Sequence, residues 1–341
     1  MSRHRPPTIR DVAARAGVSK SLVSLALQGS TRVSPHSQAA IRAAAEELGY
    51  RPNAAARSLG AARTRTIGVF LLDLHNPVTA DFVDIAQAEA RRQDFRTILV
   101  VGSDDPQAEQ SELEKLLAFR VEGMIAFGHR LPVGAQHVIG ADFPSVIVSS
   151  DHPRQPHLAT IANDDVAGAR LAVDHLVSLG HVRIAHITGG ANDVADKRRL
   201  GYQQGMQDHG LGAQLHCVEG AFSDMGGYLG MSELLSRDRL PTAVFVCSDY
   251  AAIGAMTALA ERGLRVPQDV SIIGYDDTRL SAMPTFALTT IAQPIAQMAA
   301  QAANMLTEYL DAGTDMQMST LLAPRLVLRS TTAAAQGTQV P

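Results

Sequence analysis

The stretch TIRDVAARAGVSKSLVSLAL, residues 8–27, divides into two short helix-forming segments joined by a turn at Gly17. Thr8 is a good N-cap for the first segment, and Asp11 three residues later comes close to a capping box. Gly17 permits the sharp reversal of a tight turn, and Ser19 is placed to cap the second segment. These features predict a helix-turn-helix.

The second segment has two unlike faces when its residues are placed on a helix at about 100° per residue. One arc is apolar and holds Leu22, Val23, Ala26 and Leu27. The other is mostly polar and holds Lys20, Ser21, Ser24, Leu25 and Gln28. A helix of this kind packs with one side and offers hydrogen-bonding groups to the DNA major groove with the other. The alternative is an ordinary helical hairpin with a solvated face.

A third helix is predicted after Ser34-Pro35, which is an N-cap followed by proline at the first helical position. Its segment HSQAAIRAAAEELG ends at Gly49. Asn53 then stands where it can cap a short segment, AAARSLG, at residues 54–60.

These first sixty residues resemble the lactose-repressor (LacI/GalR) family of bacterial transcription regulators. The resemblance is carried by T-I-R-D-V-A-x-x-A-G-V-S at residues 8–19, V-S at 33–34 and G-Y-R-P-N-x-x-A-R-S-L at 49–59. It implies a helix-turn-helix DNA-binding domain at residues 1–51, and a hinge helix with its linker at 52–65.

Charge is distributed unevenly along the chain, whose net charge is −4 over 341 residues. Residues 1–65 hold eleven Lys and Arg against three Asp and Glu, whereas residues 66–341 hold nineteen against thirty-one. A basic head on an acidic body indicates a phosphate-binding surface at one end. The chain lacks a run of about 18 apolar residues and a secretory signal, and its two cysteines lie far apart. We therefore expect a cytoplasmic protein without a membrane span.

Continuous apolar strand segments alternate with helical segments throughout the body, a pattern typical of parallel sheets covered by helices on both faces. The resemblance continues here through G-L-R-V-P-Q-D-V-S-I-I-G-Y-D-D-T at residues 263–278 and L-T-T-I-x-Q-P at 288–294. It implies a body like a periplasmic sugar-binding protein, with two doubly wound α/β lobes. The implied lobes are residues 66–163 plus 294–322 and residues 164–293 plus 323–341, with chain crossings near Asn163, Gln293 and Leu322.

The resemblance also implies which residues contact DNA. The base-reading positions of the second helix are Lys20, Ser21, Ser24 and Leu25, and the backbone anchors are Thr8, Ser19, Arg32 and Ser34. Leu25 departs from the polar residue common in relatives. It either offers an apolar contact to a thymine methyl or packs in the core of the headpiece.

The hinge segment is too short to form a stable helix alone. By resemblance it orders on the operator and enters the minor groove, where Leu59 is the apolar wedge and Ala56 packs against its twin in a second subunit. Asn53 and Arg57 match the same family pattern.

Ligands of open α/β sheets bind outside the carboxyl ends of the strands. This rule selects Asp73, Asn76, Ser149, Phe222, Ser248 and Asp276, and the resemblance adds Arg198 as a ligand clamp. Carboxylates, an arginine and a flanking aromatic side chain suit a polyhydroxylated ligand. Val78-Thr79 follow Asn76-Pro77 where sugar-binding relatives often have aromatics, so the pocket offers less stacking on that side.

The chain shows no metal-ligand spacing, no glycine-rich nucleotide motif and no catalytic triad pattern, so we predict neither a cofactor nor a metal nor an enzyme. We expect a transcriptional repressor that binds near-palindromic double-stranded operator DNA as a homodimer and responds to a small sugar-like effector. The C-terminal tail carries no leucine heptad, which favours a dimer over a tetramer. The alternatives are a transporter's solute-binding protein, an enzyme on the same sheet topology and a DNA-binding regulator without an effector.

Overall fold

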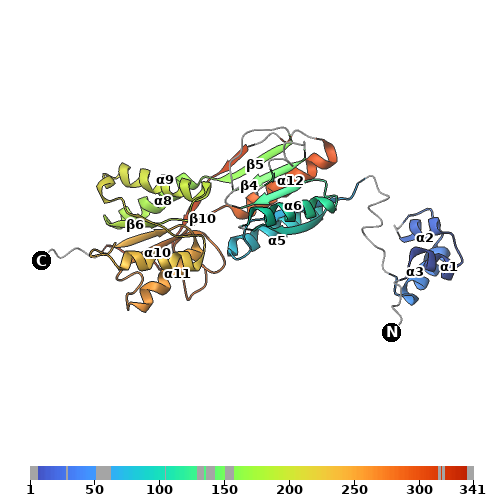
Figure 1. Cartoon of the computed structure of the whole chain (residues 1–341), viewed down its shortest axis with the longest axis horizontal. Helices are drawn as coiled ribbons and strands as arrows, with labels where there is room; N and C mark the ends of the chain where they lie inside the picture. Colours follow the sequence, from blue (N-terminus) through green and yellow to red (C-terminus); the bar gives the residue numbers. More distant parts are fainter. Residues whose placement is uncertain are drawn as a thin grey trace. The chain divides into compact units, whose positions relative to one another are not determined.

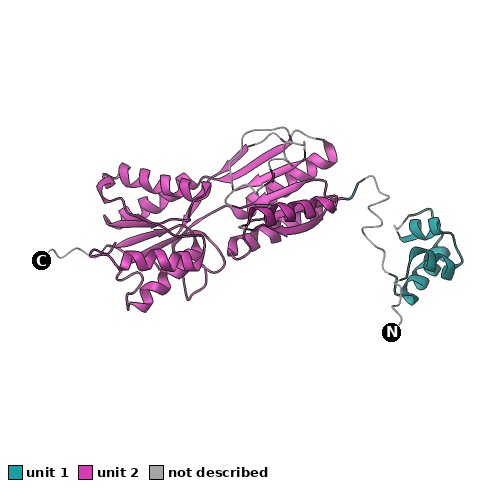
Figure 2. Ribbon diagram, in the orientation of Figure 1, with its two compact units in different colours: residues 1–64 teal, residues 65–341 magenta. Residues whose placement is uncertain are grey.

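The computed structural model describes residues 7–27, 30–50, 63–103, 105–128, 134–135, 143–149, 157–313, 316 and 319–335. The chain forms two compact units, residues 1–64 and residues 65–341 (Figure 2). Within the described ranges, no helix has the length and apolar character needed to cross a membrane.

Among its described residues, the first unit, the headpiece, contains three helices: α1 (Ile9–Ala16), α2 (Lys20–Leu27) and α3 (Pro35–Glu47). They pack around a small core in which Val12, Val23 and Ile41 are fully buried. Gly17 ends α1 in the left-handed conformation with φ at 66°, which is the conformation that a glycine turn favours. The predicted helix-turn-helix is therefore confirmed.

Local capping explains where the headpiece helices begin. The backbone N–H and hydroxyl of Thr8 each donate to Asp11 Oδ2 at 2.7 Å. Ser19 Oγ accepts from the backbone N–H of Leu22 at 3.2 Å, and Ser34 Oγ accepts from that of Ser37 at 3.2 Å. Each side chain satisfies a donor that the first helical turn would otherwise leave unpaired.

The second unit, the body, contains two lobes, each built on a sheet of six strands among the described residues (Figure 1). The sheet of lobe 1 has the order β11-β5-β4-β3-β1-β2, and its paired strands are all parallel. Its strands are β1 (Thr66–Leu71), β2 (Arg96–Val101), β3 (Met124–Phe127), β4 (Ser145–Val148), β5 (Leu158–Asn163) and β11 (Ser319–Leu322).

Helices cover both faces of the lobe 1 sheet because its strands are apolar on both sides. In β1, Ile67, Val69 and Leu71 pack with α5 (Pro77–Arg92) and α12 (Ile295–Ala312). Phe70 points the other way and packs with α6 (Pro106–Ala118). This alternation is the two-residue period of a strand buried on both faces.

The sheet of lobe 2 has the order β12-β10-β9-β8-β6-β7, and β12 alone among its described strands runs antiparallel, beside β10. Its strands are β6 (Ile184–Ile187), β7 (Cys217–Val218), β8 (Ala243–Val246), β9 (Ser271–Asp276), β10 (Thr290–Ala292) and β12 (Arg325–Val327). One face is covered by α8 (Asp165–Ser178) and α9 (Asp193–Asp208), and the other by α10 (Asp224–Leu235) and α11 (Asp249–Glu261). A short 3-10 helix, η1 (Gly212–Gln214), precedes β7.

The chain passes between the lobes after β5, after β10 and after β11. Because each crossing follows the carboxyl end of a strand, these ends of both sheets face the junction of the lobes. The predicted fold class, a helical headpiece with two doubly wound α/β lobes, is confirmed, and the antiparallel β12 is a detail that the prediction did not include.

Candidate functional site

Helix α2 presents a mostly polar face away from the headpiece core. Lys20 and Ser21 are exposed, whereas Val23 and Ala26 are buried. Leu25 exposes 38% of its surface and is absent from the apolar cluster of the headpiece. Of the two interpretations of Leu25, core packing is therefore wrong, and the side chain lies on the outward face.

The other predicted headpiece contacts occupy the ends of helices. Thr8, Ser19 and Ser34 take part in the caps described above, and Ser24 lies half-buried on α2. Arg32 is exposed, and its guanidinium has no ion pair within the described part of the headpiece. The predicted hinge contacts lie outside the described residues: Asn53, Ala56, Arg57 and Leu59.

A cavity of about 550 Å³, partly open to solvent, lies between the two lobes of the body. Six of the seven predicted effector residues line it: Asp73, Asn76, Ser149, Arg198, Phe222 and Asp276. Ser248 does not. It is fully buried and caps α11, where its Oγ accepts from the backbone N–H of Ala251 at 3.2 Å. A polar residue after a strand either faces the crevice or starts the next helix, and Ser248 does the latter.

Arg198 is the centre of the lobe 2 wall of this cavity. It is 3% exposed, and its Nε donates to Asp165 Oδ1 at 2.8 Å. Its Nη1 lies 3.5 Å from Asp276 Oδ1 and donates to the backbone carbonyl of Cys247. Burial opposes the charge, but the carboxylates of Asp165 and Asp276 outweigh it and raise the pKa of the guanidinium. Arg198 is therefore a fixed cation.

Aromatic rings complete the environment of this cation. The guanidinium lies 3.6 Å from the ring centre of Tyr275 and 5.4 Å from that of Phe222. Two glycines make room for the rings. A Cβ on Gly168 would lie 2.1 Å from the Tyr275 hydroxyl, and one on Gly189 would lie 2.5 Å from Phe222.

Asp276 ends β9 and offers an acceptor that the protein leaves unused. Its Oδ1 accepts from Gln293 Nε2 at 2.6 Å. Its Oδ2 is buried and has no hydrogen-bond partner among the residues that the structure describes. Burial raises the pKa of Asp276, nearby Asp249 adds to the rise, and Arg198 opposes it. A buried acceptor of this kind is costly unless a bound group satisfies it.

The polar residues of the lobe 1 wall lie in loops that follow strands. Asp73 Oδ1 accepts from the backbone N–H of His75 at 2.7 Å. Asn76 Oδ1 caps α5 by accepting from the backbone N–H of Val78 at 3.2 Å, so its amide N–H₂ is available to a ligand. Ser149 follows β4 with φ at 78°, in the left-handed region.

Val78 and Thr79 line the cavity beside Asn76, on the side where the sequence predicts little stacking. Sequence reasoning missed several other residues of the lining: Leu72, Phe127, Gly128, Asp165, Val194 and Gln293. Asp165 comes two residues after the end of β5, so the strand-end rule applied to that strand finds it. Gln293 lies within the L-T-T-I-x-Q-P motif, and there the resemblance implies a crossing between the lobes without marking Gln293 as a lining residue. Phe127 stacks on Phe82 with ring centres 4.1 Å apart, and no local pattern distinguishes it from an ordinary core residue.

Both units match models of known protein families. Residues 8–53 match the model of bacterial regulatory proteins of the lacI family, and residues 173–332 match a periplasmic binding protein-like domain. The HTH-type transcriptional repressor PurR of Haemophilus influenzae is 33% identical over 327 residues, which cover 94% of this chain and 97% of the repressor. The chain belongs to the lacI family.

Other lacI-family proteins agree over the same length. The ribose operon repressor of H. influenzae is 32% identical over 324 residues, covering 94% of this chain and 97% of that repressor. The Lac repressor dimer bound to operator and the anti-inducer ONPF matches with a TM-score of 0.83 and 32% identity, over 97% of this chain and all of that one. A CelR–cellobiose complex matches with a TM-score of 0.71 and 29% identity, over 95% of this chain and 99% of the other. This protein is therefore a lacI-family transcriptional regulator with a headpiece and a two-lobed body.

Proposed function

We propose that this lacI-family regulator is a repressor that binds near-palindromic operator DNA as a homodimer and is switched by a sugar or sugar derivative between its lobes. The observation that carries the proposal is the buried Arg198 held by Asp165, beside an unused acceptor on Asp276. A charged arrangement of this kind in a cavity is a typical ligand site.

The chemistry of the cavity favours a polyhydroxylated ligand. Asp276 Oδ2 is placed to accept from a ligand hydroxyl, and the amide of Asn76 is placed to donate to one from the opposite wall. Phe222 can cover the apolar face of a sugar ring. Solved lacI-family relatives with bound cellobiose and with bound ribose support this class of ligand.

The headpiece supports the DNA-binding half of the proposal. Lys20, Ser21 and Leu25 lie on the outward face of α2, where a recognition helix presents its residues to the major groove. Likeness over 97% of the chain to the operator-bound Lac repressor dimer supports two-fold binding. The hinge residues Asn53, Ala56, Arg57 and Leu59 stay predicted minor-groove contacts. A protein with these partners acts in the cytoplasm.

Arg65, the last residue of the predicted linker, is held firmly by lobe 1. Its guanidinium lies 4.2 Å from the ring centre of Phe95 and donates to Asp311 Oδ1 at 2.9 Å, and its backbone N–H donates to Glu122 at 2.6 Å. When ligand closes the lobes, lobe 1 moves the end of the predicted linker with it. Because coupling between two binding sites is reciprocal, operator DNA changes the affinity for the effector by the same factor.

We propose a binding role without catalysis, since the cavity acids are used to hold neighbours. Asp165 pairs with Arg198, and Asp276 accepts from Gln293. Neither carboxylate is paired with a nucleophile in the described part of the cavity, as an acid–base mechanism would require.

A thermal-shift screen of monosaccharides and disaccharides, followed by a gel shift, tests the proposal. We expect a sugar to raise the Tm of the full-length protein and to change its affinity for a near-palindromic fragment selected from random DNA. The matched variant Asp276→Asn should bind the same fragment and should respond to that sugar only at about ten- to hundredfold higher concentration. A protein that binds DNA identically with and without every sugar would instead be a regulator without an effector of this class.

A further inference from the structure

Lobe 2 contains another cavity, which lies at the end of its sheet opposite the effector cleft. The cavity holds about 460 Å³ of space, including solvent at its mouth. It is lined by Arg183, Ile184, Ala185, Gln214, His216, Arg239, Leu240 and Pro241. Arg183 comes directly before β6 and His216 directly before β7, while Pro241 lies two residues before the start of β8. The cavity therefore lies at the amino ends of these parallel strands. The effector cleft lies at the carboxyl ends.

The cavity has cationic side chains and no acidic lining residue. Arg183 is held in place by its Nε, which donates to the backbone carbonyl of Leu240 at 3.3 Å. Its two Nη groups make no hydrogen bond within the described part of the chain, and Arg239 makes neither a hydrogen bond nor an ion pair there. Positive charge without a counter-charge is notable in a body that is strongly acidic overall.

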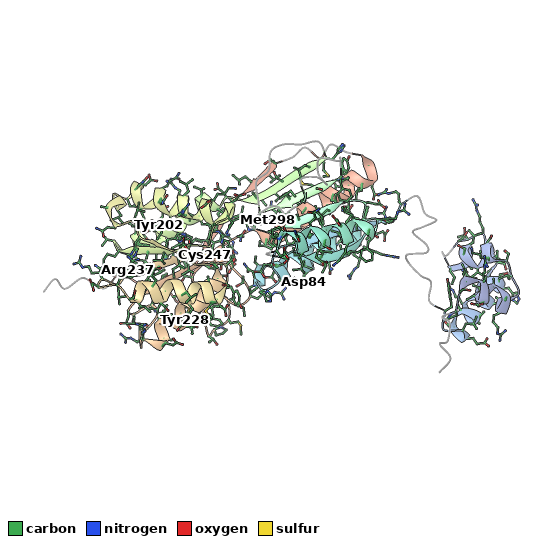
Figure 3. All side chains as sticks on the ribbon, viewed as in Figure 1. Asp84, Tyr202, Tyr228, Arg237, Cys247 and Met298 are labelled. Carbon is green, nitrogen blue, oxygen red and sulfur yellow. The ribbon has the colours of Figure 1, made fainter. Side chains whose placement is uncertain are left out.

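Glu233, an acid close enough to act on His216 of the lining, is paired with another residue. Glu233 Oε1 accepts from Arg237 at 2.5 Å. Figure 3 shows Arg237 at the end of lobe 2 that faces away from lobe 1. The cations that line the cavity therefore stay available to an anion.

His216 adds an unsatisfied buried atom. Its Nε2 is inaccessible to solvent and has no hydrogen-bond partner among the described residues. Burial lowers the pKa of His216, Arg237 lowers it further and Glu233 opposes the shift. Its backbone N–H donates to the Tyr202 hydroxyl at 3.0 Å, which fixes the residue beside β6. A rotation of the His216 ring that opens Nε2 to the cavity would let a ligand oxygen remove the cost of this unpaired atom.

We propose that this cavity binds the phosphoryl group of a small phosphorylated metabolite, as a second ligand site independent of the cleft. The free ends of Arg183 and Arg239 supply charge-assisted hydrogen bonds in the forked geometry that suits phosphate oxygens. His216 Nε2 supplies a third donor as the Nε2–H tautomer. Gln214, Leu240 and Pro241 leave a mixed polar and apolar surface for the rest of the metabolite.

The experiment measures the affinity of the full-length protein for inorganic phosphate by isothermal titration at constant ionic strength, with acetate as the reference anion. Because the headpiece and the cleft also carry cations, the decisive quantity is the difference between variants. Arg239→Ala and His216→Gln should each weaken phosphate binding about tenfold. Arg262→Ala removes an exposed cation at the end of α11 in the same lobe and should leave it unchanged.

A sugar phosphate should bind more tightly than inorganic phosphate, and its loss of affinity in Arg239→Ala should match that of phosphate. Circular dichroism of the variants checks that they fold. Equal phosphate affinity in the wild type and in both cavity variants would overturn the proposal. So would acetate binding as tightly as phosphate, or the absence of phosphate binding at millimolar concentration.

Discussion

The two walls of the effector cleft are built differently. Lobe 2 contributes a buried, interlocked set: Arg198 with Asp165 and Asp276, each less than 5% exposed. Lobe 1 contributes strand-end loops, in which the Asp73 side chain is 37% exposed and contacts its own loop through His75. The polar groups of the lobe 2 wall are therefore ordered before a ligand arrives, whereas those of the lobe 1 wall are held by local turns.

This difference indicates an order of events. We propose that a ligand first contacts the preorganised lobe 2 wall, where electrostatic complementarity is already present, and that lobe 1 then closes over it. Arg65, the last residue of the predicted linker, is fixed to lobe 1 by Phe95 and Asp311, so we expect the linker to follow that lobe. Ligand affinity should thus depend mainly on lobe 2. The change in operator affinity that the ligand causes should depend mainly on lobe 1.

The largest expected effect is on the lobe 2 wall. Arg198→Met should lower the free energy of unfolding of the body by about 3–5 kcal/mol, because it leaves two buried carboxylates without their cation. Its neighbour Arg199→Ala is the control. Arg199 is half-exposed and pairs with Asp196 at 2.8 Å on the surface, so its loss should cost less than about 1 kcal/mol. Urea unfolding measures both, and equal costs would contradict the asymmetry.

A comparison of ligand affinities sharpens the same contrast. Asp276→Asn should weaken binding of the sugar found by the screen about ten- to hundredfold, because it removes a buried charged acceptor. Asp73→Asn, the same change on the opposite wall, should weaken it at most about fivefold. Isothermal titration of both variants decides the matter, and a larger loss in Asp73→Asn would assign the primary contact to lobe 1.

The pH dependence of stability tests how deeply lobe 2 buries its acids. Asp249 accepts from Thr290 Oγ1 and from the backbone N–H and hydroxyl of Thr278, without a cation. Burial raises its pKa from 3.8 to about 6, against the opposing hydrogen bonds from Thr290 and Thr278. The folded protein therefore favours the protonated carboxyl of Asp249. Its contribution to the free energy of unfolding is full below pH 3.8 and is lost as pH rises through about 6.

The measurement for this prediction is urea unfolding of the wild type and Asp249→Asn between pH 4.5 and about 7. The wild type should lose stability with rising pH relative to the variant, whatever the absolute cost of the substitution. A difference that stays constant over this range would show that the Asp249 pKa is not raised.

The smallest expected effect concerns the contact between the lobes. Arg279 follows β9 in lobe 2, and its guanidinium reaches α5 of lobe 1. Its Nε lies 2.8 Å from Asp81 Oδ1, and its Nη2 lies 3.8 Å from Oδ2 of Asp84, which Figure 3 labels. The Arg279 side chain is 80% exposed, so Arg279→Ala should change stability by less than about 1 kcal/mol. It should change ligand affinity slightly, and only at low salt. An effect that persists at high salt would indicate a structural role beyond the ion pair.

Local signals explain which parts could be predicted from the sequence. The caps at Ser19 and Ser34 and the turn at Gly17 depend on neighbours within a few residues, so the headpiece helices followed from the sequence. The strand-end rule found most of the cleft because topology alone brings carboxyl ends together. It failed at Ser248, where the competing local role was a helix cap.

What the sequence could not reveal depends on contacts between distant segments. Arg183, His216 and Arg239 precede different strands, and nothing in their spacing shows that they share a cavity. The outward position of Leu25 was also undecided, since it lies at the margin of its arc and required the packing of α2 against α1 and α3.

The most direct test of the account is the affinity for operator DNA, measured by fluorescence anisotropy with and without saturating sugar, together with the affinity for the sugar with and without operator. The account predicts that the sugar changes operator affinity, and that operator changes sugar affinity by the same factor. Tight sugar binding in the cleft that leaves operator affinity unchanged would contradict it.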